Sequence, residues 1–318
     1  MPGLRHNDAA NFLLYLNRYV RVKNKIKKIG LNLLKLGVSV AAIWYVMSKI
    51  SFKEVLEVFS TANVYYLFGA SIFLILSFIF SAFRQNLSFR NTGANLSQSL
   101  NIKLLWLGMF YNLFLPGGIG GDGVKVYLVN KYRKNGIKKN IGTMLVNRIS
   151  GLVAIGMITV VLYYLSGLHI EYGKAAWLGI PAVYAFYIFV LKFFFKSFLK
   201  IHAGLFWWSL ALQMMQFITA LFILFAFHQT TNLFDYLFLF FVSAIATALP
   251  ITIGGIGARE MIFLIGAKTL GLNNELCIAL SLMFFLISAF ISLGGLYWVF
   301  FPPFRREQVP DKEMDEQV

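Results

Sequence analysis

The chain has 318 residues, of which 58% are hydrophobic and only 13% are charged. Soluble domains carry about 25% charged residues, so this composition excludes an ordinary soluble protein and predicts a polytopic membrane protein. A net charge of +16 would suggest nucleic acid in a soluble chain, but here the cations cluster between apolar runs. Their predicted partner is therefore the anionic surface of a membrane, and not nucleic acid.

Residues 1–30 form a basic segment ahead of the first long apolar run. Within it, Phe12, Leu16 and Tyr19 lie near one face of a helix over 10–29, which predicts an amphipathic helix on the cytoplasmic surface of the membrane. The alternative is a plain basic tail that obeys the positive-inside rule. The apolar run that starts near Leu31 is long enough to be an anchor, so we expect no cleaved signal peptide.

Six apolar runs are each long enough to cross about 30 Å of hydrocarbon, which takes about 20 helical residues. They lie near 31–50, 64–83, 142–166, 175–195, 205–227 and 276–301. We therefore predict an all-α membrane protein with about six full spans in one transmembrane domain, 31–301. The acidic stretch that follows, 302–318, is predicted to be a disordered cytoplasmic tail.

Two Gly/Pro-rich stretches form an internal repeat: LPGGIGGDGVK at Leu115–Lys125 and LPITIGGIGAR at Leu249–Arg259. Pro116 and Pro250 are 134 positions apart, and the same offset relates Lys125 to Arg259. Proline removes a helical N–H donor and glycine admits unusual backbone angles, so both stretches are predicted to break a helix. In the first copy we expect the next helix to begin near Val124.

The charges that flank the first break predict how it lies in the membrane. Cations precede the segment 102–131 and follow it, which places both of its ends in the cytoplasm and predicts a re-entrant hairpin. The second segment, 233–270, is predicted to enter from the opposite face. The halves 31–166 and 175–301 would then form an inverted-topology repeat, an architecture of transporters with a central site.

The break and its charged neighbours predict an anion site. Backbone amides at a glycine-rich turn and at a helix N-terminus bind phosphate, and cations nearby add to this. Asp122 and Glu260 are the expected partners of the cations; the alternative is that these acids receive an amine-bearing headgroup or a proton. The candidate substrate-binding residues are Asn112, Pro116, Gly120, Gly121, Asp122, Lys125, Arg148, Gly254, Gly255, Arg259 and Glu260.

Structural alternatives exist for each of these residues. Lys125 and Arg148 could extend to the membrane surface, Arg259 and Glu260 could form a purely structural ion pair, and the glycines could serve helix packing. Arg84, like the cations of 131–139, is interpreted as a determinant of topology in contact with solvent.

Several separated motifs resemble the transmembrane region of the lysylphosphatidylglycerol synthase family, a flippase-like domain. They are Asn112 and Pro116 ahead of Gly120-Gly121-Asp122, Arg148 with Gly151, and Gly254-Gly255-Ile256-Gly257 before Arg259-Glu260. The resemblance covers most of 30–301. The chain departs from the family at Lys125, where Arg is frequent, and at Asn147, which replaces an acidic residue. Because Lys lacks the two-pronged geometry of Arg, residue roles transfer less directly at that position.

The resemblance implies translocation of a phosphate-bearing lipid without its synthesis, since we expect the aminoacyl-transferring domain of the full synthases to be absent. The chain would be a transporter of the inner or plasma membrane, with both termini cytoplasmic, and not an enzyme. The alternatives are a membrane-embedded transferase acting on a polyprenyl phosphate or a phospholipid, and a scaffold subunit.

The sequence predicts no metal and no cofactor. Its four histidines lack metal-ligand spacing, and Cys277 is the single cysteine. The lipid, the direction and energy coupling of transport, and homo-oligomerisation are left open.

Overall fold

The computed structural model describes residues 57, 60–114, 120–168, 173–248 and 258–304. The chain divides into two compact units, Met1–Phe52 and Lys53–Val318, and every described residue belongs to the second unit. The predictions for the basic segment 1–30, for the span near 31–50 and for nearly all of the tail 302–318 therefore lie outside the described residues.

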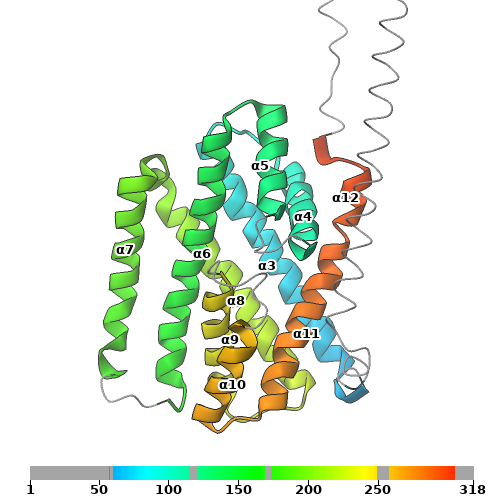
Figure 1. Ribbon diagram of the computed structural model, residues 1–318, viewed down its shortest axis with the longest axis vertical. Coiled ribbons are helices and arrows are strands. Elements are labelled where there is room, and N and C mark those ends of the chain that lie inside the picture. The colour runs from blue at the N-terminus through cyan, green and yellow to red at the C-terminus, as the bar shows by residue number, and fades with distance from the viewer. Residues whose placement is uncertain (1–56, 58–59, 115–119, 169–172, 249–257, 305–318) are drawn as a thin grey trace, which may run out of the picture. The chain divides into compact units, whose positions relative to one another are not determined.

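Every regular element in the described ranges is a helix, which confirms the predicted all-α fold (Figure 1). The elements in chain order are α3 (Val64–Asn91), α4 (Gln98–Phe114), α5 (Gly120–Arg133), α6 (Ile137–Leu165), η2 (Gly173–Leu178), α7 (Gly179–Phe194), η3 (Lys196–Ile201), α8 (His202–Ala226), α9 (Leu233–Ala248), α10 (Ala258–Leu270), α11 (Asn274–Leu293) and α12 (Leu296–Phe300).

Five stretches of the described ranges are long and apolar enough to cross a membrane. They are Val64–Asn91, Ile137–Leu165, Ala175–Phe194, Lys196–Ala226 and Glu275–Phe300. Each overlaps one of the six runs predicted from the sequence, so the protein is a multi-pass membrane protein. Asparagine side chains fix the start of two of them, because Asn63 accepts from the amide of Tyr65 and Asn273 from that of Leu276.

Two pairs of shorter helices lie on either side of the undescribed Gly/Pro stretches. The helices α4 and α5 pack against each other, and so do α9 and α10. With 17, 14, 16 and 13 residues they extend over about 20–25 Å each at 1.5 Å per residue, less than a full crossing of about 30 Å. These lengths suit the predicted re-entrant hairpins, which stay a prediction.

The helices α3 and α8 form an antiparallel pair. The amide of Asn63, just before α3, donates to the carbonyl of Ala226 at the end of α8 (2.9 Å). Near the other end of α3, Arg84 Nη1 donates to Ser209 Oγ in the first half of α8 (2.8 Å). Residue numbers thus rise along α3 while they fall along α8, so the two helices run in opposite directions (Figure 1).

Helix contacts in the two halves of the described unit correspond. The first residue of α9 lies 135 positions after the first residue of α4, and its last residue lies 134 positions after the last residue of α4. Both values are close to the offset of the sequence repeat. The contacts α4–α5, α5–α6 and α4–α11 have counterparts in α9–α10, α10–α11 and α9–α6. An internal repeat requires such matching, and the antiparallel α3–α8 pair fits its inverted form, which we carry forward as a proposal.

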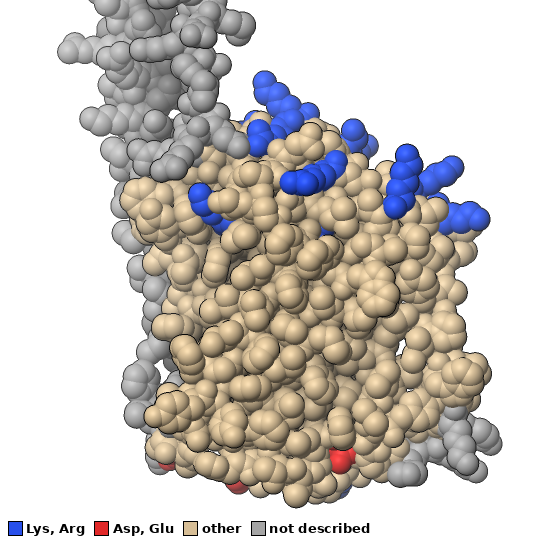
Figure 2. Space-filling view, turned by 180° about the vertical axis from the view of Figure 1, so that it is seen from behind, with Lys and Arg blue, Asp and Glu red and all other residues tan. Residues whose placement is uncertain are grey.

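Charge is distributed unequally between the two ends of the bundle. Figure 2 shows lysine and arginine side chains gathered at one end, with carboxylates at the other. The exposed cations at the first end belong to the α5–α6 turn, to the α7–α8 turn and to the end of α3: Arg90, Lys131, Lys134, Lys138, Lys139, Lys192, Lys196 and Lys200. By the positive-inside rule this basic end is the predicted cytoplasmic end.

Candidate functional site: a polar cavity inside the helix bundle

A cavity of about 360 Å³ lies among α3, α4, α5, α6 and α8. Its described lining includes three basic side chains, one carboxylate and several amides. The polar residues of the lining are Ser81, Arg84, Gln85, Asn112, Asp122, Lys125, Asn147, Arg148, Gln213 and Gln216. The volume lies within the range of about 300 to 1,000 Å³ that ligand sites have, and the lining is more polar than such sites usually are.

Asp122 holds two of the three basic side chains. Its Oδ1 lies 2.9 Å from Lys125 Nζ, one turn further along α5. Its Oδ2 lies 2.8 Å from both Nη2 and Nε of Arg148, which belongs to α6. Ion pairing offsets the cost of placing these cations among apolar helices, so the sequence prediction that Asp122 partners them agrees with this geometry.

Lys125 has a second partner on α3. Its Nζ donates to Gln85 Oε1 (2.9 Å), and Gln85 Nε2 donates in turn to Asn101 Oδ1 (2.8 Å). Asn101 Nδ2 donates to the backbone carbonyl of Ala82 (2.6 Å). The ammonium group is therefore buried and fixed by a chain of hydrogen bonds through α3 and α4, and it does not extend to the surface.

The helices α4 and α5 approach each other at two glycines. A Cβ placed on Gly121 would overlap the carbonyl of Gly108, and one placed on Gly108 would lie 2.9 Å from Lys125 Cε. Asn112 Oδ1 accepts from the amide of Gly121 (2.8 Å). Small residues at this crossing let the two backbones touch, which brings Asn112 and Lys125 to the same cavity.

The predicted start of the helix near Val124 is wrong, because α5 begins at Gly120. Two features explain the earlier start: Asn112 satisfies a first-turn amide that would otherwise lack a partner, and Asp122 places a negative charge in that turn, where the helix dipole favours it. The amide of Gly121 is thus occupied by Asn112. The anion-binding character of the cavity rests mainly on side chains.

The interpretation of Arg84 as a solvated topology determinant is wrong. Arg84 lines the cavity, donates from Nη1 to Ser209 Oγ (2.8 Å) and lies against Gly151, where a Cβ would come within 3.2 Å of Nη1. Its position misled the sequence analysis because α3 continues to Asn91, beyond the apolar run that ends near 83. A polar stripe at helical spacing, formed by Ser77, Ser81, Arg84 and Ser88, was the available signal.

Arg148 also lies deeper in its helix than the apolar run indicated. The helix α6 begins at Ile137, so Arg148 is about 16 Å along it at 1.5 Å per residue. Its side chain is 38% exposed and forms part of the lining of the cavity.

The predicted site residues divide into those that the described part of the chain brings together and those that it does not describe. Asn112, Gly121, Asp122, Lys125 and Arg148 meet at or beside the cavity, with Gly120 one residue away at the start of α5. Pro116, Gly254 and Gly255 lie outside the described residues, and Arg259 and Glu260 lie in the first turn of α10 without described side chains.

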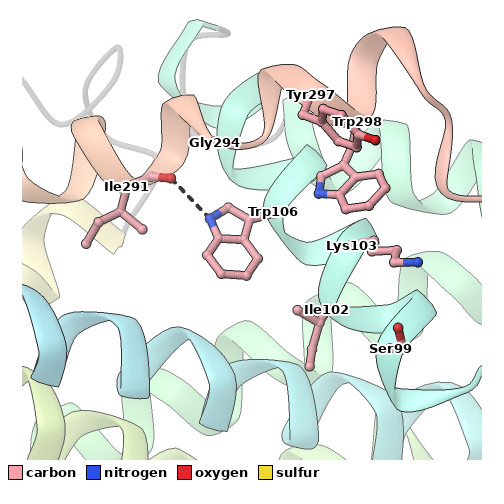
Figure 3. Close-up of a pocket in the computed structure, with 8 residues that line it drawn as sticks. All are labelled: Ser99, Ile102, Lys103, Trp106, Ile291, Gly294, Tyr297 and Trp298. Carbon is pink, nitrogen blue, oxygen red and sulfur yellow. Dashed lines mark hydrogen bonds between the residues drawn. The ribbon is translucent and has the colours of Figure 1, made fainter.

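A second hollow of about 590 Å³ lies between α4 and the α11–α12 end of the chain (Figure 3). Trp106 Nε1 donates to the carbonyl of Ile291 (3.1 Å), and Lys103 Nζ lies 5.1 Å from the ring centre of Trp298. This groove is larger than the polar cavity, but its lining is mostly apolar and offers one charged group, Lys103. The convergent polar groups make the smaller cavity the candidate site.

The described residues contain no group of three His, Cys, Asp or Glu side chains that could hold a metal ion. Of the described residues that line the cavity, one is of this kind, Asp122, and it is paired with two cations.

Comparison with known proteins identifies the family. The family model described as lysylphosphatidylglycerol synthase TM region matches residues 32–295. No curated protein matches the chain. The family match spans most of the chain and includes every helix that lines the polar cavity, in agreement with the resemblance drawn from the sequence motifs. The chain therefore belongs to the lysylphosphatidylglycerol synthase transmembrane-region family.

Proposed function

We propose that this protein is a lipid transporter that moves a phosphate-bearing headgroup through the polar cavity. One observation carries the proposal: among the described residues, the cavity inside the helix bundle is lined by Arg84, Lys125 and Arg148 but by a single carboxylate, Asp122. A cation among membrane helices costs at least about 2.5–3.5 kcal/mol on insertion scales, so such an excess is expected only where it serves an anionic ligand.

The size of the cavity supports a headgroup as the ligand. A volume of about 360 Å³ is at the small end of ligand sites, enough for a phosphate with a short substituent but not for the acyl chains. The acyl chains would then remain in the hydrocarbon, and the polar cavity would spare the headgroup from crossing it, which is the largest cost of lipid translocation. The contrast between a polar interior and an apolar exterior favours this division.

We place the protein in the inner or plasma membrane with the basic end and both termini in the cytoplasm. The clustering of exposed cations at one end supports this orientation through the positive-inside rule and through attraction to anionic lipid headgroups. The corresponding contacts of the two halves support an inverted repeat, in which the α4–α5 and α9–α10 pairs would give access from opposite faces.

Transport by purified protein in liposomes tests the proposal. Fluorescent phospholipids in the inner leaflet are bleached on reaching the outer leaflet, so the rate of bleaching reports translocation. We expect wild type to move an anionic phospholipid, and Lys125→Ala and Arg148→Ala to reduce the rate at least tenfold. Lys131→Ala is the matched control, because Lys131 lies on the same helix as Lys125 but is exposed at the basic end.

The outcomes separate the proposal from its alternatives. Transport that is equal in all three variants would show that the cavity does not carry the headgroup. Folded protein without any transport would favour the enzyme or the scaffold, and conversion of a lipid donor and acceptor by the purified protein would identify the former.

A further inference from the structure

The turn between α5 and α6 carries four exposed lysines at the basic end of the bundle. They are Lys131, Lys134, Lys138 and Lys139, and we call them the basic turn. In the part of the chain that the structure describes, no carboxylate lies within ion-pair distance of their ammonium groups. The positive-inside rule accounts for the side of the membrane on which these cations lie, but it does not say what neutralises them.

Hydrogen bonds within the turn hold its backbone in one conformation. Asn135 and Asn140 exchange two side-chain hydrogen bonds (2.8 and 2.9 Å), and Asn130 Oδ1 accepts from the amide of Gly136 (3.2 Å). Gly136 has a φ of +102°, a conformation that favours glycine. The amide side chains are thus used within the turn, and the lysines are the groups that it offers to a partner.

The last described residue, Phe304, lies beside the basic turn. It is fully buried, and its ring stacks on that of Tyr132, with centroids 4.5 Å apart and planes within 8° of parallel. Phe304 belongs to a hydrophobic cluster built by α3, α4, α5 and α6, which includes Phe89, Leu104 and Val129. This burial fixes the point from which the following residues continue, next to the lysines of the turn.

The sequence after Phe304 separates its charges. Arg305 and Arg306 follow directly, whereas most of the carboxylates lie further along. The stretch 311–316, which we call the acidic segment, has four acids and one lysine: Asp311, Glu313, Asp315, Glu316 and Lys312. Four negative charges and one positive charge give it a net charge of −3, opposite in sign to the basic turn.

The acidic segment is close enough along the chain to reach the basic turn. Asp311 follows Phe304 by seven positions, and an extended chain covers about 3.3–3.6 Å per position, so Asp311 reaches up to about 23–25 Å from Phe304. Lys139 follows Tyr132 by seven positions, so the same limit holds for the most distant lysine of the turn. Since Phe304 contacts Tyr132, and Glu316 reaches further than Asp311, every lysine of the basic turn lies within reach of a carboxylate.

We propose that the acidic segment 311–316 binds the basic turn and competes there with anionic lipid headgroups. Exposed ion pairs are individually weak, but the tether at Phe304 supplies an effective concentration on the order of millimolar, as short flexible linkers do. The tail thereby controls how much anionic lipid this end of the bundle holds. The proposal is independent of the proposed function, because it concerns the surface of the basic end and not the polar cavity.

Distances between spin labels on the full chain in phosphatidylcholine nanodiscs test the contact. Met314→Cys labels the acidic segment and Ile137→Cys, an exposed position at the start of α6, labels the basic turn. The buried Cys277 is replaced by alanine. We expect a population of short distances at about 0.1 M salt that falls about twofold or more at about 1 M, where the Debye length shrinks from about 10 to about 3 Å.

A second pair of labels shows whether salt changes the bundle itself. Thr269→Cys lies in the last turn of α10, and the α10–α11 turn is at the opposite end of the bundle from the α5–α6 turn (Figure 1). The separation between this label and the one at Ile137→Cys should be the same at both salt concentrations. Short distances to the acidic segment that persist unchanged at high salt would overturn a contact made by charge.

Neutralising either side of the contact should separate the labels. The combined variants Lys134→Gln/Lys138→Gln/Lys139→Gln and Asp311→Asn/Glu313→Gln/Asp315→Asn/Glu316→Gln should each lower the short-distance population about twofold or more at low salt. Lys268→Gln, which changes an exposed cation near the end of α10, is the matched control and should behave like wild type. An equal loss in the control, or no loss in either combined variant, would contradict the proposal.

The role of the tether is tested by Phe304→Ala. Removing the buried ring lowers the effective concentration of the acidic segment at the turn, so the short-distance population should fall. A population unchanged in folded Phe304→Ala protein would contradict the anchoring role of Phe304. The neutralising variants change exposed positions only on the side of the basic turn, so they remain informative if Phe304→Ala does not fold.

Nanodiscs that also contain phosphatidylglycerol distinguish the acidic segment from lipid as the occupant of the turn. We expect the anionic headgroups to lower the short-distance population, because they compete for the same cations. A population that phosphatidylglycerol leaves unchanged would overturn the competition. The absence of short distances in phosphatidylcholine at low salt would overturn the acidic segment as the partner and leave anionic lipid as the occupant.

Discussion

The pair α4–α5 and the pair α9–α10 occupy corresponding places in the repeat but have different interiors. The first pair contacts α6 through the ion pair of Asp122 with Arg148 and α3 through the hydrogen bond of Lys125 to Gln85, both beside the polar cavity. The second joins a large apolar cluster through side chains such as Phe240, Phe263 and Ala267. The repeat therefore preserves the arrangement of helices, whereas the polar chemistry is concentrated in one copy.

Residues 134 positions apart make this difference concrete. The positions that correspond to Arg84, Asn112, Asp122 and Arg148 are Ile218, Ala246, Ile256 and Leu282. Of the three cations in the described lining of the cavity, Lys125 alone has a cationic counterpart, Arg259, in the first turn of α10. The apolar substitutions suit a copy whose role is to pack, and they indicate that one half of the bundle supplies most of the recognition of an anion.

The largest expected effect in the polar half comes from Asp122→Asn. It leaves Lys125, which is buried, without its carboxylate, and removing one partner of such a pair costs about 3–5 kcal/mol. We expect a lower midpoint of thermal unfolding in detergent. Adding Lys125→Met should recover most of the loss, because the unpaired charge is then gone. Glu275→Gln, which changes an exposed acid in the first turn of α11, is the control, and an equal loss there would contradict the comparison.

A smaller loss is expected from Gln85→Leu. The amide of Gln85 accepts from Lys125 and donates to Asn101, so leucine removes a hydrogen bond to a charged group, worth about 1.5–3 kcal/mol. The unfolding midpoint in detergent measures the change. Gln229→Leu, in the exposed turn after α8, should change it little. A Gln85→Leu variant as stable as this control would show that Lys125 depends on Asp122 alone.

Two neighbouring glycines of α5 should respond oppositely to alanine. Gly121→Ala places a methyl group on the carbonyl of Gly108, and overpacking of this kind costs about 1–3 kcal/mol. Gly123 has no atom within 4 Å of a built Cβ, so Gly123→Ala should stabilise the helix by up to about 1 kcal/mol. Comparing the thermal unfolding of both variants with wild type tests the close approach of α4 and α5; losses of the same size would argue against it.

The smallest effect is expected in the apolar pair. A Cβ on Gly266 of α10 would meet the end of the Leu239 side chain, which can change rotamer, whereas the obstacle at Gly121 is backbone. We therefore expect Gly266→Ala to cost less than Gly121→Ala, near the lower end of the about 1–3 kcal/mol typical of overpacking. A loss in its unfolding midpoint larger than that of Gly121→Ala would reverse the ranking of the two helix pairs.

The sequence predicted the parts of the molecule that depend on local composition. Long apolar runs identified the five described spans, and the glycine-rich break with Asp122, Lys125 and Arg148 identified half of the cavity. The half formed by Arg84, Gln85 and Gln213 was missed, because these residues lie within or next to apolar runs. Which face of such a helix is buried depends on its neighbours, and a single sequence does not give those neighbours.

The contact between Gly108 and Gly121 has a consequence for how the cavity could change its access. Because the two backbones touch and Asn112 bonds to the amide of Gly121, α4 cannot slide along α5 without losing both contacts. We therefore expect the pair to move as one rigid body. Its link to α6 includes the ion pair of Asp122 with Arg148, which a bound anion could replace. Spin labels on α4 and α5 should keep a fixed separation when ligand is added, and labels on α5 and α6 should report the motion.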